Sequence, residues 1–235
     1  MFPILLEAAG DIWRYVLQMI PCMLVALFGF VLIYPLRQKR LARLGLFSSP
    51  LREIGLLIFV LFFAGLTALT LFPNNLWVYI MQPNRYPEGV TFWSFYPTSQ
   101  QILQQLETLL DQLSKILKPF PYGLEWHFRS YWFAFLFFGN IVMFLPIGFF
   151  PALLWRGVSW WKALLTGIFL SLFIETVQFF INRGTDLDDL ILNSVGAFLG
   201  YICYRIIHFL APTITSRFQC ISRRETESDG RPCGN

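Results

Sequence analysis

The stretch IETVQFFINRGTDLDDLILNSVGAFLG, from Ile174 to Gly200, has polar residues inside two long apolar segments and in the short turn that joins them. These residues are Glu175 and Gln178 in the first segment, Arg183, Asp186 and Asp189 around the turn, and Asn193 in the second segment. An ionisable side chain inside a membrane costs several kcal/mol, so it usually has a partner and a function there. The stretch therefore predicts two neighbouring membrane helices with a polar cluster near the end where they are joined.

The composition of the whole chain places it among integral membrane proteins. Of the 235 residues, 56% are hydrophobic, 18% are aromatic and only 14% are charged, whereas a soluble domain carries about 25% charged residues. The apolar residues are concentrated in long runs, which is typical of membrane spans. The length suits one membrane bundle better than two soluble domains.

Five apolar runs are each close to the length of about 20 residues that a helix needs to cross a bilayer. We expect these helices at residues 16–36, 54–72, 131–150, 163–181 and 190–210. Pro21 and Pro146 fall inside two of them and predict kinks. The predicted fold is an all-α membrane protein, with a transmembrane domain over residues 1–210 and a disordered, polar tail over residues 211–235.

Basic residues predict how the bundle is oriented. With five spans, three segments rich in Lys and Arg fall on one side of the membrane. They contain Arg37, Lys39, Arg40, Arg43 and Arg52, then Arg156 and Lys162, then Arg217, Arg223, Arg224 and Arg231. The positive-inside rule places the N-terminus outside and the C-terminus in the cytoplasm. Because this topology explains the net charge of +4, we expect no nucleic-acid partner.

The long external segment over residues 73–130 contains a second kind of helix. Apolar residues recur at spacings of three and four over residues 99–118, which predicts an amphipathic helix. Thr98 and Gln101 form a capping box before it, and Pro119 ends it. Three uses remain open for this helix: it lies on the outer membrane interface, it makes a short coiled-coil contact, or it packs on the protein's own outer surface.

Helical spacing brings the polar residues together. Glu175 and Gln178 share one face of their helix, and Asn193 enters the next helix at a comparable depth. Gly196 and Gly200 follow Asn193 on its face, where small residues let helices approach closely. Asn140 lies near the middle of the span over residues 131–150, which also contains Pro146 and Gly148, and a bend at the proline would direct this helix toward the group.

An architectural interpretation accounts for each of these residues singly. Asp186 would cap the last span, and the carboxylates that follow it would favour the positive end of the helix dipole. Gln178 and Asn193 would hold helices together, and Arg183 would pair with Glu175 or an aspartate. This interpretation is weakest for Glu175, because a buried carboxylate is an expensive way to join two helices.

The same residues resemble the VanZ-like family, which is named for a membrane protein associated with glycopeptide (teicoplanin) resistance. Its pattern is matched in three places: NIVMFLPIGF with Asn140, Phe144, Pro146 and Gly148; IETVQ with Glu175 and Gln178; and RGTDLDDLILNSVGAFLG with Arg183, Asp186, Asp189, Asn193, Gly196 and Gly200. The resemblance is good over the last three spans and looser over the first two, where TLFP ends the second. The helix over residues 99–118 is a departure, since many members have a shorter loop there.

The resemblance implies a multi-pass protein of the bacterial cytoplasmic (inner) membrane with a link to the cell envelope or to antibiotic response. The first hypothesis is that the cluster binds a polar lipid head group, a lipid-linked precursor or a glycopeptide near the outer leaflet. The alternative is an enzyme in which Glu175 acts as general acid or base on a lipid head group. Asp186 and Asp189 are then candidate ligands for a divalent cation, and no other cofactor is evident from the sequence. A transporter is a third hypothesis, less favoured because no inverted repeat is evident. The sequence does not distinguish a monomer from an oligomer.

Overall fold

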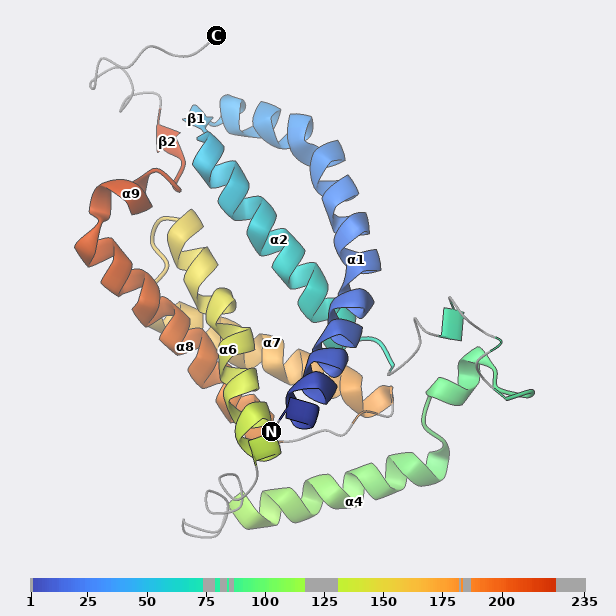
Figure 1. The fold of residues 1–235 in the computed structure, drawn as a ribbon. Helices are drawn as coiled ribbons and strands as arrows, with labels where there is room; N and C mark the ends of the chain where they lie inside the picture. The colour runs from blue at the N-terminus through green and yellow to red at the C-terminus, as the bar shows by residue number, and fades with distance from the viewer. Residues whose placement is uncertain are drawn as a thin grey trace.

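The computed structural model describes residues 2–73, 79–80, 84, 87–116, 131–181, 183 and 187–222. Within these residues it contains five helices long and apolar enough to cross a membrane (Figure 1). They are α1 (Phe2–Arg43), α2 (Pro50–Thr70), α6 (Tyr131–Leu154), α7 (Trp160–Phe180) and α8 (Leu187–Leu210). This architecture confirms the predicted all-α bundle of five membrane helices.

Helix α1 is much longer than the predicted span over residues 16–36. It continues through Pro21 and Pro35 and curves toward the start of α2 at its far end (Figure 1), as expected where proline removes a helical hydrogen bond. Gly45 follows the helix with a φ of 66°, a left-handed conformation that glycine adopts without strain. Helix α1 packs chiefly on α2, where Gln18 Nε2 donates to the Ala68 carbonyl at 3.4 Å.

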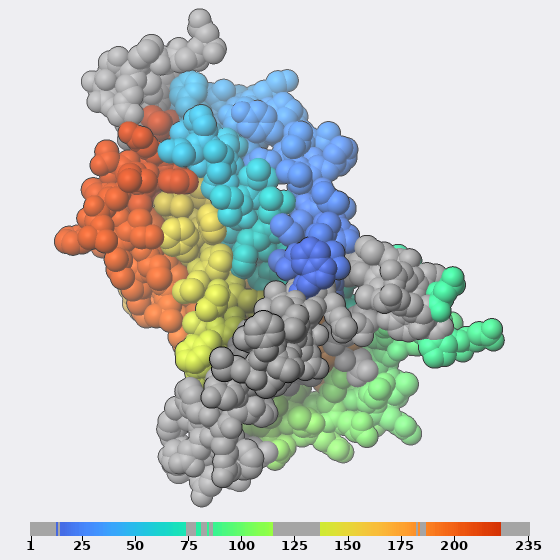
Figure 2. Space-filling view, in the orientation of Figure 1, coloured from blue at the N-terminus to red at the C-terminus, as the bar shows by residue number. Residues whose placement is uncertain are grey.

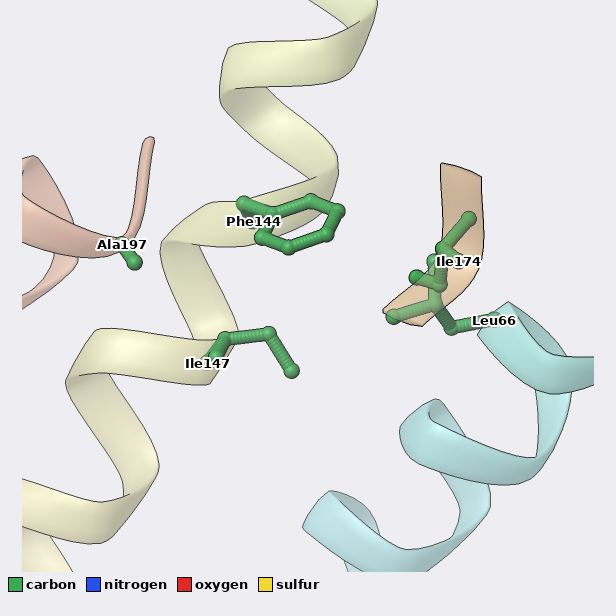
Figure 3. Packing of buried hydrophobic residues seen from close by; sticks show 5 residues of the cluster. All are labelled: Leu66, Phe144, Ile147, Ile174 and Ala197. Carbon is green, nitrogen blue, oxygen red and sulfur yellow. The ribbon is translucent and has the colours of Figure 1, made fainter. Parts of the chain in front are cut away.

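The other four spans form the core. Helix α6 lies between α8 on one side and α2 on the other, and α7 packs on α8 and α6. Figure 3 shows Phe144 and Ile147 pointing from α6 toward Leu66 of α2 and Ile174 of α7, with Ala197 of α8 on the opposite side. Burying these side chains fixes the arrangement of α2, α7 and α8 around α6.

Glycines allow α6 and α8 to pack almost backbone to backbone. A Cβ atom on Gly196 would overlap the Ile141 carbonyl, and one on Gly200 would overlap the Leu145 carbonyl. From the other helix, a Cβ atom on Gly148 would overlap the Ala197 carbonyl. The structure thus places Gly148, Gly196 and Gly200 at one contact, and the helix opposite the two α8 glycines is α6. Pro146 lies within the same part of α6 without interrupting the helix.

The external amphipathic helix is present as α4 (Ser99–Ile116), and residues 117 and 118 of the predicted helix lie outside the described part of the chain. Gln101 Oε1 accepts from the Thr98 backbone N–H at 2.8 Å, and Thr98 Oγ1 accepts from the Gln101 N–H at 3.4 Å. A short 3-10 helix, η2 (Phe92–Phe95), precedes it. Helix α4 lies across one end of the bundle (Figure 1), which we call the α4 end.

The opposite end carries two short strands, so we call it the strand end. Strand β1 (Leu46–Phe47) pairs antiparallel with β2 (Ile221–Ser222), and helix α9 (Pro212–Ser216) connects α8 to β2. The predicted disorder of residues 211–235 is therefore wrong for residues 211–222, because the backbone of β1 gives this part of the tail a hydrogen-bonding partner. Residues 223–235 lie outside the described residues.

A network around one carboxylate joins α1 to α2 at the strand end. Glu53 accepts hydrogen bonds from Arg37, Gln38 and Ser48, and Arg52 donates to Ser48 Oγ at 3.1 Å. The turn between α6 and α7 reaches the same end, since Leu154 and Phe218 both pack beside Gly55. The described basic residues of the segments that the sequence assigns to one side are thus at one end of the bundle.

Candidate functional site

The polar cluster lies toward the α4 end, where α2 and α7 finish and α8 begins. Its first element joins α6 to α8, because Asn140 Nδ2 donates a hydrogen bond to the Asp189 carboxylate. Both side chains are partly buried. Asp189 lies in the first turn of α8, where the helix dipole also favours its negative charge. An amide and a carboxylate distant in sequence therefore meet between two parallel helices.

The second element joins α8 to α7. Asn193 Nδ2 donates to Ser171 Oγ at 2.9 Å, and the two residues are only 4% and 0% exposed. The other amide atom, Asn193 Oδ1, is buried and has no hydrogen-bond partner among the described residues. A buried carbonyl without a donor is unusual and costs about 1–3 kcal/mol. It marks a position where a donor from another molecule would be stabilised.

Helix α7 carries the carboxylate of the cluster. Ser171, Glu175 and Gln178 recur at spacings of four and three and share one face, and Glu175 is only 6% exposed. Gln178 is partly buried, and its backbone carbonyl accepts from the N–H of Ile181 and of Arg183, at 3.2 and 3.1 Å. The end of α7 is therefore closed by the turn that leads to Arg183.

The partner of Arg183 differs from the expected carboxylate. Its Nη1 donates to the backbone carbonyls of Leu69 and Phe72, the latter at 3.1 Å, so the guanidinium caps the C-terminal end of α2. No carboxylate of the described residues is within ion-pair distance of it. A positive charge at this position is favoured by the helix dipole. Arg183 thus donates to backbone carbonyls at the end of α2 and not to Glu175 or Asp189, while Asp186, another expected partner, lies outside the described residues.

Burial also affects the titration of Arg183. Removal from water lowers the pKa of the guanidinium, and the negative charge that Tyr15 carries when ionised acts in the opposite direction. Arginine starts from so high a value that it stays protonated near neutral pH.

The remaining predicted residues divide into two groups. Asp189 and Asn193 are part of the observed contacts, whereas Asp186 lies outside the described residues. Among the described residues, no group of three or more His, Cys, Asp and Glu side chains is arranged to hold a metal ion. The structure thus brings Asn140 to Asp189, Asn193 to Ser171, and Arg183 to the end of α2.

Two contacts were not predicted from the sequence. Ser171 lies one turn before Glu175 on the same face, and this spacing was the available signal. Gln112 of α4 accepts a hydrogen bond at 3.3 Å from the backbone N–H of Leu187, the first residue of α8. No local pattern would have linked residues so far apart in sequence. Through this bond α4 contacts the helix end that carries the cluster.

The described side chains of the cluster present mainly hydrogen-bond acceptors. Glu175 and Asp189 supply carboxylates and Asn193 supplies an unpaired amide oxygen, while the Arg183 guanidinium donates to backbone carbonyls. Acceptors of this kind bind ammonium and hydroxyl groups. Chemically, the unpaired Asn193 oxygen is suited to a ligand group that donates a hydrogen bond.

Comparison with known proteins identifies one family. The family model described as VanZ/LLP1 matches residues 59–208, which include most of α2, all of α6 and α7, nearly all of α8, and every residue of the cluster. No curated protein and no solved structure matches the chain.

Proposed function

The chain is an integral membrane protein of the VanZ/LLP1 family, and from this premise we propose that its polar cluster binds a polar, amine- or hydroxyl-bearing group. The group belongs to a lipid head group, a lipid-linked envelope precursor or a glycopeptide antibiotic, and it enters from the leaflet at the α4 end. Through this binding the protein alters how the cell envelope responds to glycopeptides.

The observation that carries this proposal is the unpaired oxygen of Asn193. Asn193 is 4% exposed, and its Oδ1 atom has no donor among the described residues. Asn193 is bonded to Ser171 of α7. Glu175 lies one helical turn after Ser171 and is 6% exposed. The Asn193 oxygen costs free energy because it is buried without a donor among the described residues. A ligand that donates to this oxygen would recover the cost, and the nearby Glu175 carboxylate would favour a ligand that carries a positive charge.

The orientation of the bundle assigns the cluster to the outer leaflet in this proposal. The segments with many basic residues lie at the strand end, where Arg37, Arg52 and Arg217 are found. If that end faces the cytoplasm as the positive-inside rule requires, the α4 end faces outward. Lipid-linked precursors and glycopeptides both present polar groups at that surface.

Substitution of Glu175 tests the proposal. In a strain deleted for the gene, wild type and Glu175→Gln, Asp186→Asn and Asp189→Asn variants are expressed at matched membrane levels, and glycopeptide susceptibility is measured. We expect Glu175→Gln to lose the resistance that wild type restores, because glutamine keeps the shape but removes the charge. The control is Glu107→Gln, an exposed carboxylate on α4, which should behave as wild type.

Lipid analysis of the same strains separates binding from chemistry. Binding alone leaves the envelope lipids and precursors unchanged in structure, and the purified wild-type protein retains a lipid or precursor that Glu175→Gln lacks. A new lipid species made only by wild type would instead support the enzymatic alternative. Wild-type susceptibility and ligand retention in all three cluster variants would refute a functional cluster.

A further inference from the structure

Helix α4 has three different faces. One face is partly buried toward the bundle and contains Ile102, Gln105, Leu109 and Gln112. A second face is polar and contains Gln104, Glu107, Thr108, Asp111 and Ser114. The third consists of four leucines, which we call the leucine face: Leu103, Leu106, Leu110 and Leu113, which are 60%, 46%, 58% and 48% exposed.

The positions of the faces around the helix are set by its period. At about 100° per residue, the leucine face is centred about 100° from the bundle-facing side and about 120° from the polar side. The leucines therefore do not project directly away from the protein. They point sideways, beside the bundle, whereas the polar residues occupy the remaining side. A helix packed only on its own protein would have no reason to gather leucines there.

The location of α4 tells what lies beside the bundle at that level. The helix crosses the ends of the spans (Figure 1), forms an edge of the molecule in the space-filling view (Figure 2), and contacts α7 and α8. Its Gln112 is bonded to the first residue of α8. Phe180, the last residue of α7, is 59% exposed, so the apolar outer surface of the spans extends to the level of α4.

We propose that α4 is an interfacial helix whose leucine face is inserted into the acyl chains of the leaflet at the α4 end. The bundle-facing side holds it to α7 and α8, and the polar side faces water. A helix that lies in the interface needs such an apolar face next to a polar one. On the polar side the acidic residues Glu107 and Asp111 outnumber the basic Lys115, so insertion depends on apolar contact and not on attraction to anionic lipids.

Site-specific fluorescence quenching tests this placement. In the full chain with its four cysteines replaced by alanine, single cysteines are introduced by Leu106→Cys and Leu110→Cys on the leucine face, and by Glu107→Cys and Thr108→Cys on the polar face. Each protein is labelled with an environment-sensitive fluorophore and reconstituted into phosphatidylcholine vesicles. Quenching is measured with lipids that carry a nitroxide near the head of the acyl chain, and separately with aqueous iodide.

We expect the nitroxide lipid to reduce the fluorescence at positions 106 and 110 much more than at 107 and 108, with iodide giving the reverse order. Replacing part of the phosphatidylcholine with phosphatidylglycerol should leave this order unchanged. Iodide quenching at 106 and 110 as strong as at 107 and 108 would overturn the proposal. Protection of 106 and 110 from both quenchers would also overturn it, in favour of a second copy or a protein partner. Leu103→Cys replaces either leucine variant that gel filtration shows to be misfolded.

Discussion

Asn193 uses the two atoms of its amide differently, and this makes its contribution to stability measurable. Its nitrogen donates to Ser171 Oγ, whereas its oxygen is buried without a donor. We predict that Asn193→Ala and Ser171→Ala are coupled in a double-mutant cycle by about 0.6 kcal/mol and not more than about 1.7 kcal/mol, the range found for hydrogen bonds between membrane helices. Unfolding in mixed micelles measures the four free energies.

Ser194 provides the control for this cycle. Its hydroxyl donates to the Leu190 carbonyl within α8, so Ser194→Ala removes a local bond and none to α7. The pair Asn193→Ala with Ser194→Ala should be closer to additive than the pair with Ser171. Strict additivity of Asn193→Ala with Ser171→Ala would mean that the bond between α7 and α8 contributes nothing to stability.

At the residue level, the sequence indicates which polar residues need partners better than it indicates what those partners are. Asn140, Glu175 and Asn193 could be predicted to need polar partners because polar groups are costly in apolar spans. Ser171 had only its shared face with Glu175 as a signal, and this signal is weak because a hydroxyl in a membrane helix can also donate to the carbonyl four residues before it, as Thr176 does. The partners of Arg183 are backbone carbonyls, which every residue type supplies, so no sequence pattern identifies them.

The contact between α6 and α8 depends on glycine, and one methyl group tests it. A Cβ atom on Gly200 of α8 would overlap the Leu145 carbonyl, whereas one on Gly139 of α6 would meet nothing within 4 Å. We predict that Gly200→Ala lowers the free energy of unfolding by about 1–3 kcal/mol through overpacking. Gly139→Ala should be neutral or raise it by up to about 1 kcal/mol, because alanine favours the helix.

Unfolding in mixed micelles measures the stability of these two variants. Their function is compared with that of the wild type and of Glu175→Gln. Loss of stability in both glycine variants would show that any methyl group harms these helices, and loss in neither would show that α6 and α8 are not in close contact. A Gly200→Ala protein that also loses the function lost by Glu175→Gln would link the spacing of the helices to the cluster.

Glu53 connects α1 to α2 through its hydrogen bonds, and its substitution tests how much this connection contributes to stability. Glu53 accepts hydrogen bonds from Arg37, Gln38 and Ser48. The Arg37 guanidinium also lies 4.4 Å from the centre of the Phe30 ring. We predict that Glu53→Ala costs about 2 kcal/mol and more than Arg37→Ala, which retains the other two bonds to Glu53. Thermal unfolding in detergent checks the order, and a larger loss for Arg37→Ala would contradict it.

Secondary-structure elements could be predicted where a regular sequence pattern extends over many residues. The spans come from apolar length and α4 from its leucine spacing and capping box, and both signals extend over many residues. Strands β1 and β2 have two residues each, too few for any alternation to be visible. Their pairing joins residues about 175 positions apart, a relation of tertiary structure. The same reason explains why part of the tail was expected to be disordered.

For the molecule as a whole, the family match covers the buried core and also α4, which lies outside that core. The match begins within α2 and ends near the end of α8, and these helices with α6 and α7 form the buried core. Helix α1 packs chiefly on α2, and α4 attaches to the ends of α7 and α8. The cluster lies in this core, within the matched residues, and α4 lies across the end of the core nearest to it.

The direction of the whole bundle across the membrane can be measured with single cysteines. Cys220 precedes β2 at the strand end, and Thr108→Cys lies on the polar face of α4 at the opposite end. If the positive-inside rule holds, a membrane-impermeant maleimide added to intact cells should label Thr108→Cys and should label Cys220 only after the membrane is permeabilised. The other cysteines are replaced in both proteins, and labelling of denatured protein controls for reactivity. Labelling of Cys220 in intact cells would place the strand end outside. It would move the cluster to the cytoplasmic leaflet, where an external glycopeptide cannot reach it, while leaving the insertion of α4 into a leaflet to be judged by its own experiment.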